Sequence, residues 1–375
     1  MTHGTLRVAC RRLNTIIASR AFREWRVERG LAEYGLVVAG GDGDDRAVAD
    51  CSMFTCGWWR PITPLSGPRG DACSAIVEDE DGQPEMWVMG GSDGRGNILT
   101  TVEAYNPRTN TWRSCLPLSQ RRMGAVTGVV GGRLVVAGGD AGIGPLTSVE
   151  AYTPTGWTPL PPLPHAAAGA TACMLNGRLY VMGGRGCNKL QVLEMSEEIE
   201  FSWTVKADLP AARRLAASVV HEGKLWLMGG LIDQEATELT TEDVAIYDPE
   251  NDTWAAGPPL PRAVIRGHAT VLDGEIHFVS TSDDKAANRV KSFEALGAGN
   301  KPESKSTPIQ VASSAPMTSF ALFRCTPLFS IALSIRPASA TASPSEPRLN
   351  SIMSSVANAK QWSILSGLFT SAAST

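Results

Sequence analysis

The chain has 375 residues, 43% of them hydrophobic, and a formal net charge of −4. This balance argues against a nucleic-acid-binding protein, which normally presents a basic surface. No apolar run reaches the roughly 18 residues of a membrane-spanning helix, and the eight cysteines include no CxxC pair. A reduced protein of the cytoplasm or nucleus is therefore expected.

Residues 1–30 are predicted to form a basic helical segment. Their apolar positions, among them Leu13, Ile17 and Trp25, do not alternate as in a strand, and Gly30 is the expected helix end. Seven arginines stand against two glutamates. The composition leaves two alternatives open: an organelle-targeting peptide, because no acidic residue precedes Glu24, and a helix that only packs against the rest of the chain.

From residue 36 onward, one short pattern recurs at a nearly constant interval. RLVVAGG, RLYVMGG and KLWLMGG each join a basic residue, four apolar residues and two glycines. Self-similarity at about 45 to 50 residues marks a repeat fold. A sixth, degenerate copy reads EIHFVST, and the five intact pairs are Gly40-Gly41, Gly90-Gly91, Gly138-Gly139, Gly183-Gly184 and Gly229-Gly230.

Each repeat has the pattern of four short strands. An apolar run closed by a turn precedes the glycine pair, and a run such as TVEAYNP or DVAIYDP follows it. A four-stranded sheet with two apolar faces needs neighbouring sheets to cover it, which predicts an all-β, six-bladed β-propeller. The glycines are expected to supply positive φ and close backbone approach. Tryptophans that fill the space between blades are expected at Trp112, Trp157, Trp203 and Trp254.

The two ends of the repeat region are irregular. No strand precedes LVVAGG in the first repeat, whose last strand is expected around Trp58 and Trp59. After residue 297 the composition shifts to Ser, Ala, Thr and Pro, with no further glycine pair. This composition predicts a low-complexity, disordered tail over residues 298–375.

The glycine pair, the apolar strand before it, the tyrosine, the turn and the tryptophan together resemble the kelch repeat. The resemblance covers residues 36–296. It implies a kelch-type propeller over residues 31–297, in which the two ends of the domain can share one blade.

The segment VACRRLNTIIASRAFREWRVERGLAE, which runs into LVVAGG, resembles the last part of an F-box and the connector of F-box/kelch-repeat proteins. The Leu-Pro segment that begins an F-box has no counterpart in these residues. The resemblance implies a Skp-type adaptor and a cullin as partners. It also implies that the propeller is the substrate receptor of an SCF-type E3 ubiquitin ligase.

A candidate partner-binding surface follows from aligning the repeats on their glycine pairs. Arginine then recurs at the start of the first strand, and first strands line the channel of a propeller. Guanidinium groups bind carboxylates and phosphates bidentately, which favours a client protein with an acidic or phosphorylated segment. The residues expected to rim one face are Arg69, Arg122, His165, Arg213, Arg214 and Arg266.

A structural role for each arginine is the alternative, in which it tethers a loop or pairs with an acid of a neighbouring blade. The two hypotheses predict opposite results for alanine at Arg122 and Arg213. A binding role predicts weaker partner binding at nearly unchanged thermal stability. A structural role predicts a loss of stability with no change in affinity.

No catalytic or metal-binding pattern stands out. The chain has no GxSxG elbow, phosphate loop or zinc-protease helix, and its five histidines are not spaced as a metal pair. The sequence therefore predicts a protein-interaction module that is not an enzyme, without metal or cofactor and without a nucleic-acid or membrane partner. Two alternatives are a kelch scaffold for cytoskeletal or signalling partners without a ubiquitin role, and a metal-dependent enzyme similar to galactose oxidase.

Overall fold

The computed structural model of the chain describes residues 33–42, 46–55, 58–79, 82–198, 200–234, 237–272, 275–281, 290–296 and 319–325. Every regular element among these residues is a β-strand, which confirms the predicted all-β class. The predicted helix over residues 1–30, with its F-box remnant, lies outside the described residues, as does most of the range 298–375. No helix of the described part has the length and apolar character needed to cross a membrane.

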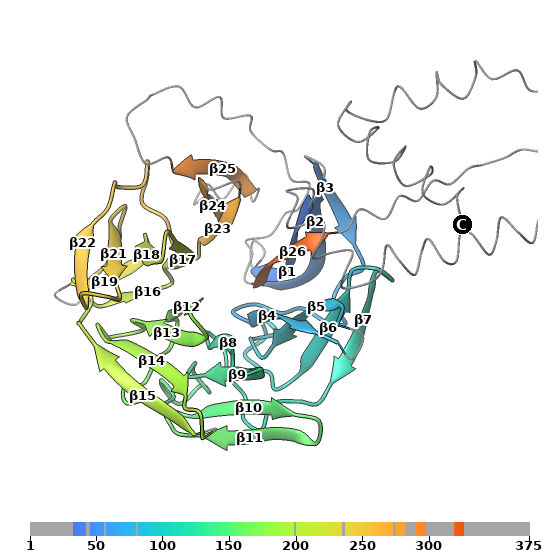
Figure 1. Cartoon of the computed structure of the whole chain (residues 1–375). Coiled ribbons are helices and arrows are strands. Elements are labelled where there is room, and N and C mark those ends of the chain that lie inside the picture. Colours follow the sequence, from blue (N-terminus) through green and yellow to red (C-terminus); the bar gives the residue numbers. More distant parts are fainter. Residues whose placement is uncertain are drawn as a thin grey trace, which may run out of the picture. The chain divides into compact units, whose positions relative to one another are not determined.

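Most strands belong to six antiparallel sheets, the blades, which follow one another around a common axis (Figure 1). The first strands of successive blades contact each other along this axis. From the axis outwards, the blades are blade 1 (β26 Ser319–Cys325, β1 Glu33–Asp42, β2 Ala47–Thr55, β3 Trp58–Ile62), blade 2 (β4 Cys73–Glu78, β5 Pro84–Met89, β6 Val102–Asn106, β7 Thr111–Cys115), blade 3 (β8 Val126–Val130, β9 Arg133–Ala137, β10 Val149–Thr153, β11 Gly156–Leu160), blade 4 (β12 Thr171–Leu175, β13 Arg178–Met182, β14 Leu190–Met195, β15 Phe201–Lys206), blade 5 (β17 Ala217–His221, β18 Lys224–Met228, β21 Val244–Asp248, β22 Thr253–Ala256) and blade 6 (β23 His268–Leu272, β24 Glu275–Thr281, β25 Val290–Leu296).

Blade 1 takes its innermost strand from the far end of the propeller sequence. Strand β26 pairs antiparallel with β1, with Val37 opposite Ala321. The expectation of a disordered tail is therefore corrected for residues 319–325, because the apolar run SFALFRC suits a strand beside the open edge of β1. The last strand of this blade, β3, begins at Trp58 as predicted.

The antiparallel order divides the connections between two faces. The connections from the second to the third strand of a blade, and from the fourth strand to the next blade, lie on one face, called here the connector face. The tight hairpins within each blade lie on the opposite face, the hairpin face. In blade 5 the connector face carries a small additional sheet of β16 (Arg213–Arg214), β19 (Leu231–Gln234) and β20 (Thr237–Thr240).

The glycine pairs hold the connections between blades. In all five pairs the first glycine has φ between 61° and 69°. A Cβ at that glycine would collide with a carbonyl oxygen of the connection to the next blade, and the second glycine donates its N–H to the same oxygen at 2.6 to 2.9 Å. The positive φ and the close backbone approach expected of the pairs are both confirmed. The five accepting residues are Arg69, Arg122, Ala167, Arg213 and Val264.

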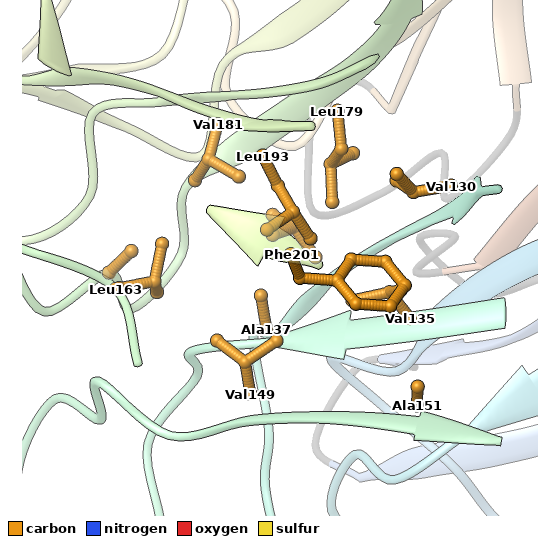
Figure 2. Close-up of a cluster of buried hydrophobic side chains, with 12 residues drawn as sticks. Val130, Val135, Ala137, Val149, Ala151, Leu163, Leu179, Val181, Leu193 and Phe201 are labelled. Carbon is orange, nitrogen blue, oxygen red and sulfur yellow. The ribbon is translucent and has the colours of Figure 1, made fainter. Parts of the chain in front are cut away.

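Apolar side chains fill the space between successive blades. Between blades 3 and 4, Val135 and Ala137 of β9 belong to one buried cluster with Leu179 and Val181 of β13 (Figure 2). The repeat tryptophans pack against such clusters, and each one forms a hydrogen bond to the chain that follows the preceding blade. Their indole N–H groups donate to backbone carbonyls at 2.8 to 3.0 Å, in the pairs Trp112 to Thr63, Trp157 to Leu116, Trp203 to Pro161 and Trp254 to Ala207.

Candidate functional site

Three of the predicted binding arginines are buried and do not form a rim. Arg69, Arg122 and Arg213 are 3%, 1% and 4% exposed. Each guanidinium donates to acceptors within its own blade. A charge can leave water only when such partners replace its hydration, so these side chains are committed to the fold. This finding corrects the prediction that they contact a partner.

Arg122 shows the full arrangement. Its Nη2 lies 2.9 Å from Oε1 of Glu150 in β10, and its Nη1 donates to the carbonyl oxygens of Gly138 and Ser148 at 2.8 and 3.0 Å. The other Glu150 oxygen accepts hydrogen bonds from the N–H and hydroxyl groups of Ser119. These contacts between the arginine, the glutamate and the backbone are called here the clamp. The clamp ties the connection that enters blade 3 to the middle of the blade. It is the structural role left open by the sequence.

The residues at the arginine and glutamate positions of the clamp change together in blades 2 to 4. Blade 2 repeats it with Arg69 and Glu103, 2.8 Å apart. In blade 4 both charges are replaced, because Ala167 and the buried Gln191 take the two positions. The Gln191 amide then pairs with the backbone N–H and C=O of His165. In blades 2 to 4, the buried carboxylate is present where a buried guanidinium needs it and absent where there is none, in line with the cost of an uncompensated buried charge.

Blade 5 keeps the arginine without the matching glutamate. Ala245 stands opposite Leu227, the position that glutamate holds in blades 2 and 3. Arg213 donates to the carbonyl oxygen of Asp243 at 3.1 Å, and the carboxylate of this residue is 4.0 Å away. Burial lowers the pKa of Arg213, an effect that the Asp243 charge opposes. Within the described structure the buried Nε of Arg213 has no hydrogen-bond partner.

Replacing Ala245 with glutamate is therefore expected to raise the free energy of unfolding by about 1 to 2 kcal/mol. The new carboxylate would supply a charged acceptor to a guanidinium that is already desolvated. Urea denaturation at neutral pH measures the change. Ala245→Gln is the control, since it adds similar volume without charge. Equal losses of stability in both variants would show that blade 5 has no room for the clamp.

The remaining predicted residues lie on the connector face. His165 is exposed in the connection into blade 4, and Arg214 is half-buried in β16. Arg266 is half-buried at the entry to blade 6 and lines a cavity at the channel. Partner binding by these three residues stays a prediction.

A belt of backbone hydrogen bonds surrounds the channel on the connector face. It runs through Asp71, Gly124, Gly169, Leu215 and Arg266. Each member after the first donates its N–H to the carbonyl oxygen of the corresponding residue one blade earlier, at 2.8 or 2.9 Å. All members have a left-handed backbone, with φ from 49° to 65°. This conformation is uncommon outside glycine and for non-glycine residues stores strain, a feature that often marks functional sites.

A salt bridge joins the two ends of the belt. Arg266 of blade 6 places Nη1 3.3 Å from Oδ1 of Asp71, which precedes blade 2. The side chains are 31% and 28% exposed, so water reaches both groups. The mouth of the channel is therefore uneven. It has a charged side at Arg266 and Asp71, whereas Gly124 and Gly169 add no side chain of their own and Gly169 lies beside the Leu215 side chain.

All five belt residues line a cavity of about 300 Å³. Small residues such as Ala125 and Ala170 follow the belt, and hydroxyl groups lie further along the first strands. The Thr171 and Ser218 hydroxyls are hydrogen-bonded to each other across two blades at 2.6 Å. A wall of alanines and hydroxyls, with one cation and one anion at its mouth, is suited to holding a side chain of another molecule.

Two titratable groups of this wall are kept in their neutral forms. Burial lowers the pKa of His268 to about 4 and raises the pKa of the Cys73 thiol to about 12. Near neutral pH the imidazole is therefore uncharged, and the thiol is not a thiolate nucleophile. Within the described ranges, no group of three His, Cys, Asp or Glu side chains is placed to hold a metal ion. The described cavity offers recognition groups in their neutral state and one ion pair.

The belt was not predicted from the sequence, although a signal for it exists. Its members stand two residues after the clamp positions, so Gly124 follows Arg122 and Arg266 follows Val264. A small residue comes directly after every belt member: Ala72, Ala125, Ala170, Ala216 and Gly267. Aligning the repeats on these small residues would have separated the channel positions from the buried clamp.

Comparison with known sequences agrees with this architecture. A sequence model described as the kelch motif matches residues 83–118, 121–164 and 212–261. The protein carries kelch repeats. The three matched stretches fall on blades 2, 3 and 5, which retain the glycine pair, the tyrosine and the tryptophan together.

Several curated kelch-like proteins are similar to this chain. Kelch-like protein 35 of Mus musculus is 27% identical over 234 residues, which cover 60% of this chain and 37% of that protein. Kelch-like protein 26 of Danio rerio is 24% identical, with 63% and 40% covered, and kelch-like protein 23 of Homo sapiens is 28% identical, with 56% and 38% covered. The chain spans 40% or less of the length of these relatives.

A solved structure supports the same fold. The structure of YjhT matches with a TM-score of 0.55 at 15% identity and covers 66% of this chain and 91% of that chain. At this identity the likeness concerns the fold alone. The described blades are therefore those of an all-β kelch fold.

Proposed function

We propose that this kelch protein is a protein-interaction module that binds a client at the channel mouth on its connector face. The observation that carries the proposal is the belt, whose five residues line a cavity of about 300 Å³ and include the Arg266–Asp71 ion pair. Two exposed large hydrophobic residues, Ile143 and Leu239, lie in connections of the same face and would add apolar contacts at the rim.

We further propose that the client is a substrate of a cullin-type ubiquitin ligase, for which this chain is the receptor. The resemblance of residues 8–33 to the end of an F-box supports this role. The alternative is a scaffold that binds cytoskeletal or signalling partners without a ligase. The two roles share the client site and differ only in whether a Skp-type adaptor and a cullin accompany it.

Replacing Gly169 with leucine tests the client site. The change would place a side chain in the lining of the cavity, where the new Cβ lies 3.3 Å from the flexible Leu215 Cδ2. Leu215 has the same left-handed backbone, with φ 54°, at the equivalent belt position of the next blade. A leucine at Gly169 can therefore adopt the φ of that position. Recovery of client proteins with the full chain, measured by quantitative mass spectrometry, is expected to fall by about tenfold or more, as for a change at the centre of an interface.

Gly177→Leu is the matched control. Gly177 has φ 74° with open space around it, and it lies in a hairpin on the opposite face. Both variants therefore carry a similar backbone strain, and only Gly169→Leu narrows the mouth. Equal recovery of clients by the two variants would contradict a client site at the channel.

The same purification separates the ligase role from the scaffold role. A receptor is expected to bring down a Skp-type adaptor and a cullin with the wild-type chain, and the Gly169→Leu variant should retain both. Clients recovered without adaptor and cullin would favour the scaffold.

A further inference from the structure

The ion pair at the channel mouth differs from the buried clamps of the same propeller. Arg266 Nη1 lies 3.3 Å from Asp71 Oδ1, whereas the clamp pairs Arg69–Glu103 and Arg122–Glu150 lie at 2.8 and 2.9 Å. The clamp side chains are 4% exposed or less, and the mouth pair is about 30% exposed. An exposed ion pair changes an equilibrium constant by less than about fivefold. An incoming anion can therefore replace the Asp71 carboxylate beside Arg266.

The surroundings of the pair favour such an exchange. Arg266 and Asp71 are the two charged members of the belt, and both line the cavity. Gly124 and Gly169 line the same cavity and add no side chain to it, so a segment of another protein would meet backbone at these two positions. The hydroxyls of Thr171 and Ser218 lie further inside the same cavity and are neutral. The guanidinium of Arg266 is therefore the cationic feature of this cavity wall.

We propose that Arg266 holds an oxyanion of the client, and that the Asp71 carboxylate occupies its place in the free protein. This inference rests on the proposed function and names the chemistry of the client. The oxyanion is an acidic side chain or a phosphate, both of which match a guanidinium. Asp71 then acts as an internal competitor that lowers affinity and restricts binding to ligands able to displace it.

The test uses the full chain and three short glycine-flanked peptides. One contains glutamates, one contains glutamines at the same places, and one contains a single phosphoserine. Dissociation constants come from NMR titrations at low and at physiological ionic strength. The wild-type chain is expected to bind at least one anionic peptide and not the glutamine peptide. The anionic peptide with the lower constant identifies the source of the oxyanion.

Asp71→Asn is expected to tighten anionic binding by about two- to fivefold at low ionic strength, with a smaller gain at physiological salt. Arg266→Gln should abolish it, and Arg266→Lys, which keeps the charge and loses the fork of donors, should weaken it. If Arg266→Gln does not fold, Arg266→Lys alone provides the test of the arginine. Unchanged or weaker binding in Asp71→Asn, or unchanged binding in Arg266→Gln or Arg266→Lys, would overturn the inference.

The hairpin face offers a matched control for released charge. Glu194 pairs with Arg178 at 2.9 Å, and both side chains are partly exposed. Glu194→Gln frees an arginine in the same way as Asp71→Asn, but away from the channel. An equal gain in anionic binding from Glu194→Gln would show a general charge effect and would also overturn the inference.

Failure of this inference can be told apart from failure of the proposed function. If Gly169→Leu loses the clients while Asp71→Asn does not change anion binding, the channel mouth binds a client by other contacts. If Gly169→Leu keeps the clients, the client site itself is elsewhere, whatever the peptides do.

Discussion

Replacing Arg122 with alanine is expected to lower the free energy of unfolding by about 3 to 5 kcal/mol. The substitution leaves Glu150 charged and 2% exposed, without the guanidinium that compensates it. It also removes the Arg122 donor from the Gly138 and Ser148 carbonyl oxygens, of which Ser148 keeps the N–H of Gly138. Urea denaturation followed by tryptophan fluorescence measures the shift in midpoint. The loss would be a large part of the stability of an ordinary domain.

A double variant turns this expectation into a test of the clamp itself. Arg122→Ala combined with Glu150→Gln reproduces in blade 3 the pair that blade 4 has naturally, Ala167 and Gln191. The double variant is expected to recover a large part of the lost stability, because no charge is left buried and unpaired. A double variant as unstable as Arg122→Ala alone would show that the hydrogen bonds to the carbonyls, and not the buried charge, dominate.

Replacing Gly183 with alanine is expected to cost about 3 kcal/mol. The new methyl group would collide with the carbonyl oxygen of Arg213, and the backbone there has φ 69°. A carbonyl held by Gly184 at 2.8 Å cannot move aside without breaking the connection to blade 5. The thermal midpoint and the urea midpoint should both fall.

Gly186→Ala separates the collision from the backbone strain. Gly186 has φ 65°, and nothing lies within 4 Å of the position that a Cβ would take there. Strain alone should cost about 1 kcal/mol in this variant. If the two alanine variants lose equal stability, close approach to the connection is not the reason for the first glycine of the pair.

The repeat period, the glycine pairs and the final strand of blade 1 were predictable because each has a local signature. A glycine pair after four apolar residues indicates a backbone with positive φ. Trp58 and Trp59 begin the short strand β3, as expected. Strand β26 was missed because its pairing partner β1 lies almost the whole chain away. Strand propensity in SFALFRC does not reveal which edge it joins.

Three of the six predicted binding residues were placed wrongly, because an arginine near a channel has two stable destinations. Arg122 could reach water at the rim or a carboxylate inside the blade, and its own position does not decide between them. The deciding residue is Glu150 in the third strand, which recurs as Glu103 with Arg69 and becomes Gln191 beside Ala167. Comparing each connection with the third strand of its blade would have assigned Arg69 and Arg122 to the interior.

The remote origin of β26 sets an order of events during synthesis. Blades 2 to 5 are each built from one continuous stretch of the chain, so each can form as it leaves the ribosome. Blade 1 must wait with β1 unpaired on its inner side until residue 325 has emerged. A nascent or prematurely terminated chain would therefore present a bare strand edge, which makes it a target for chaperones and for self-association.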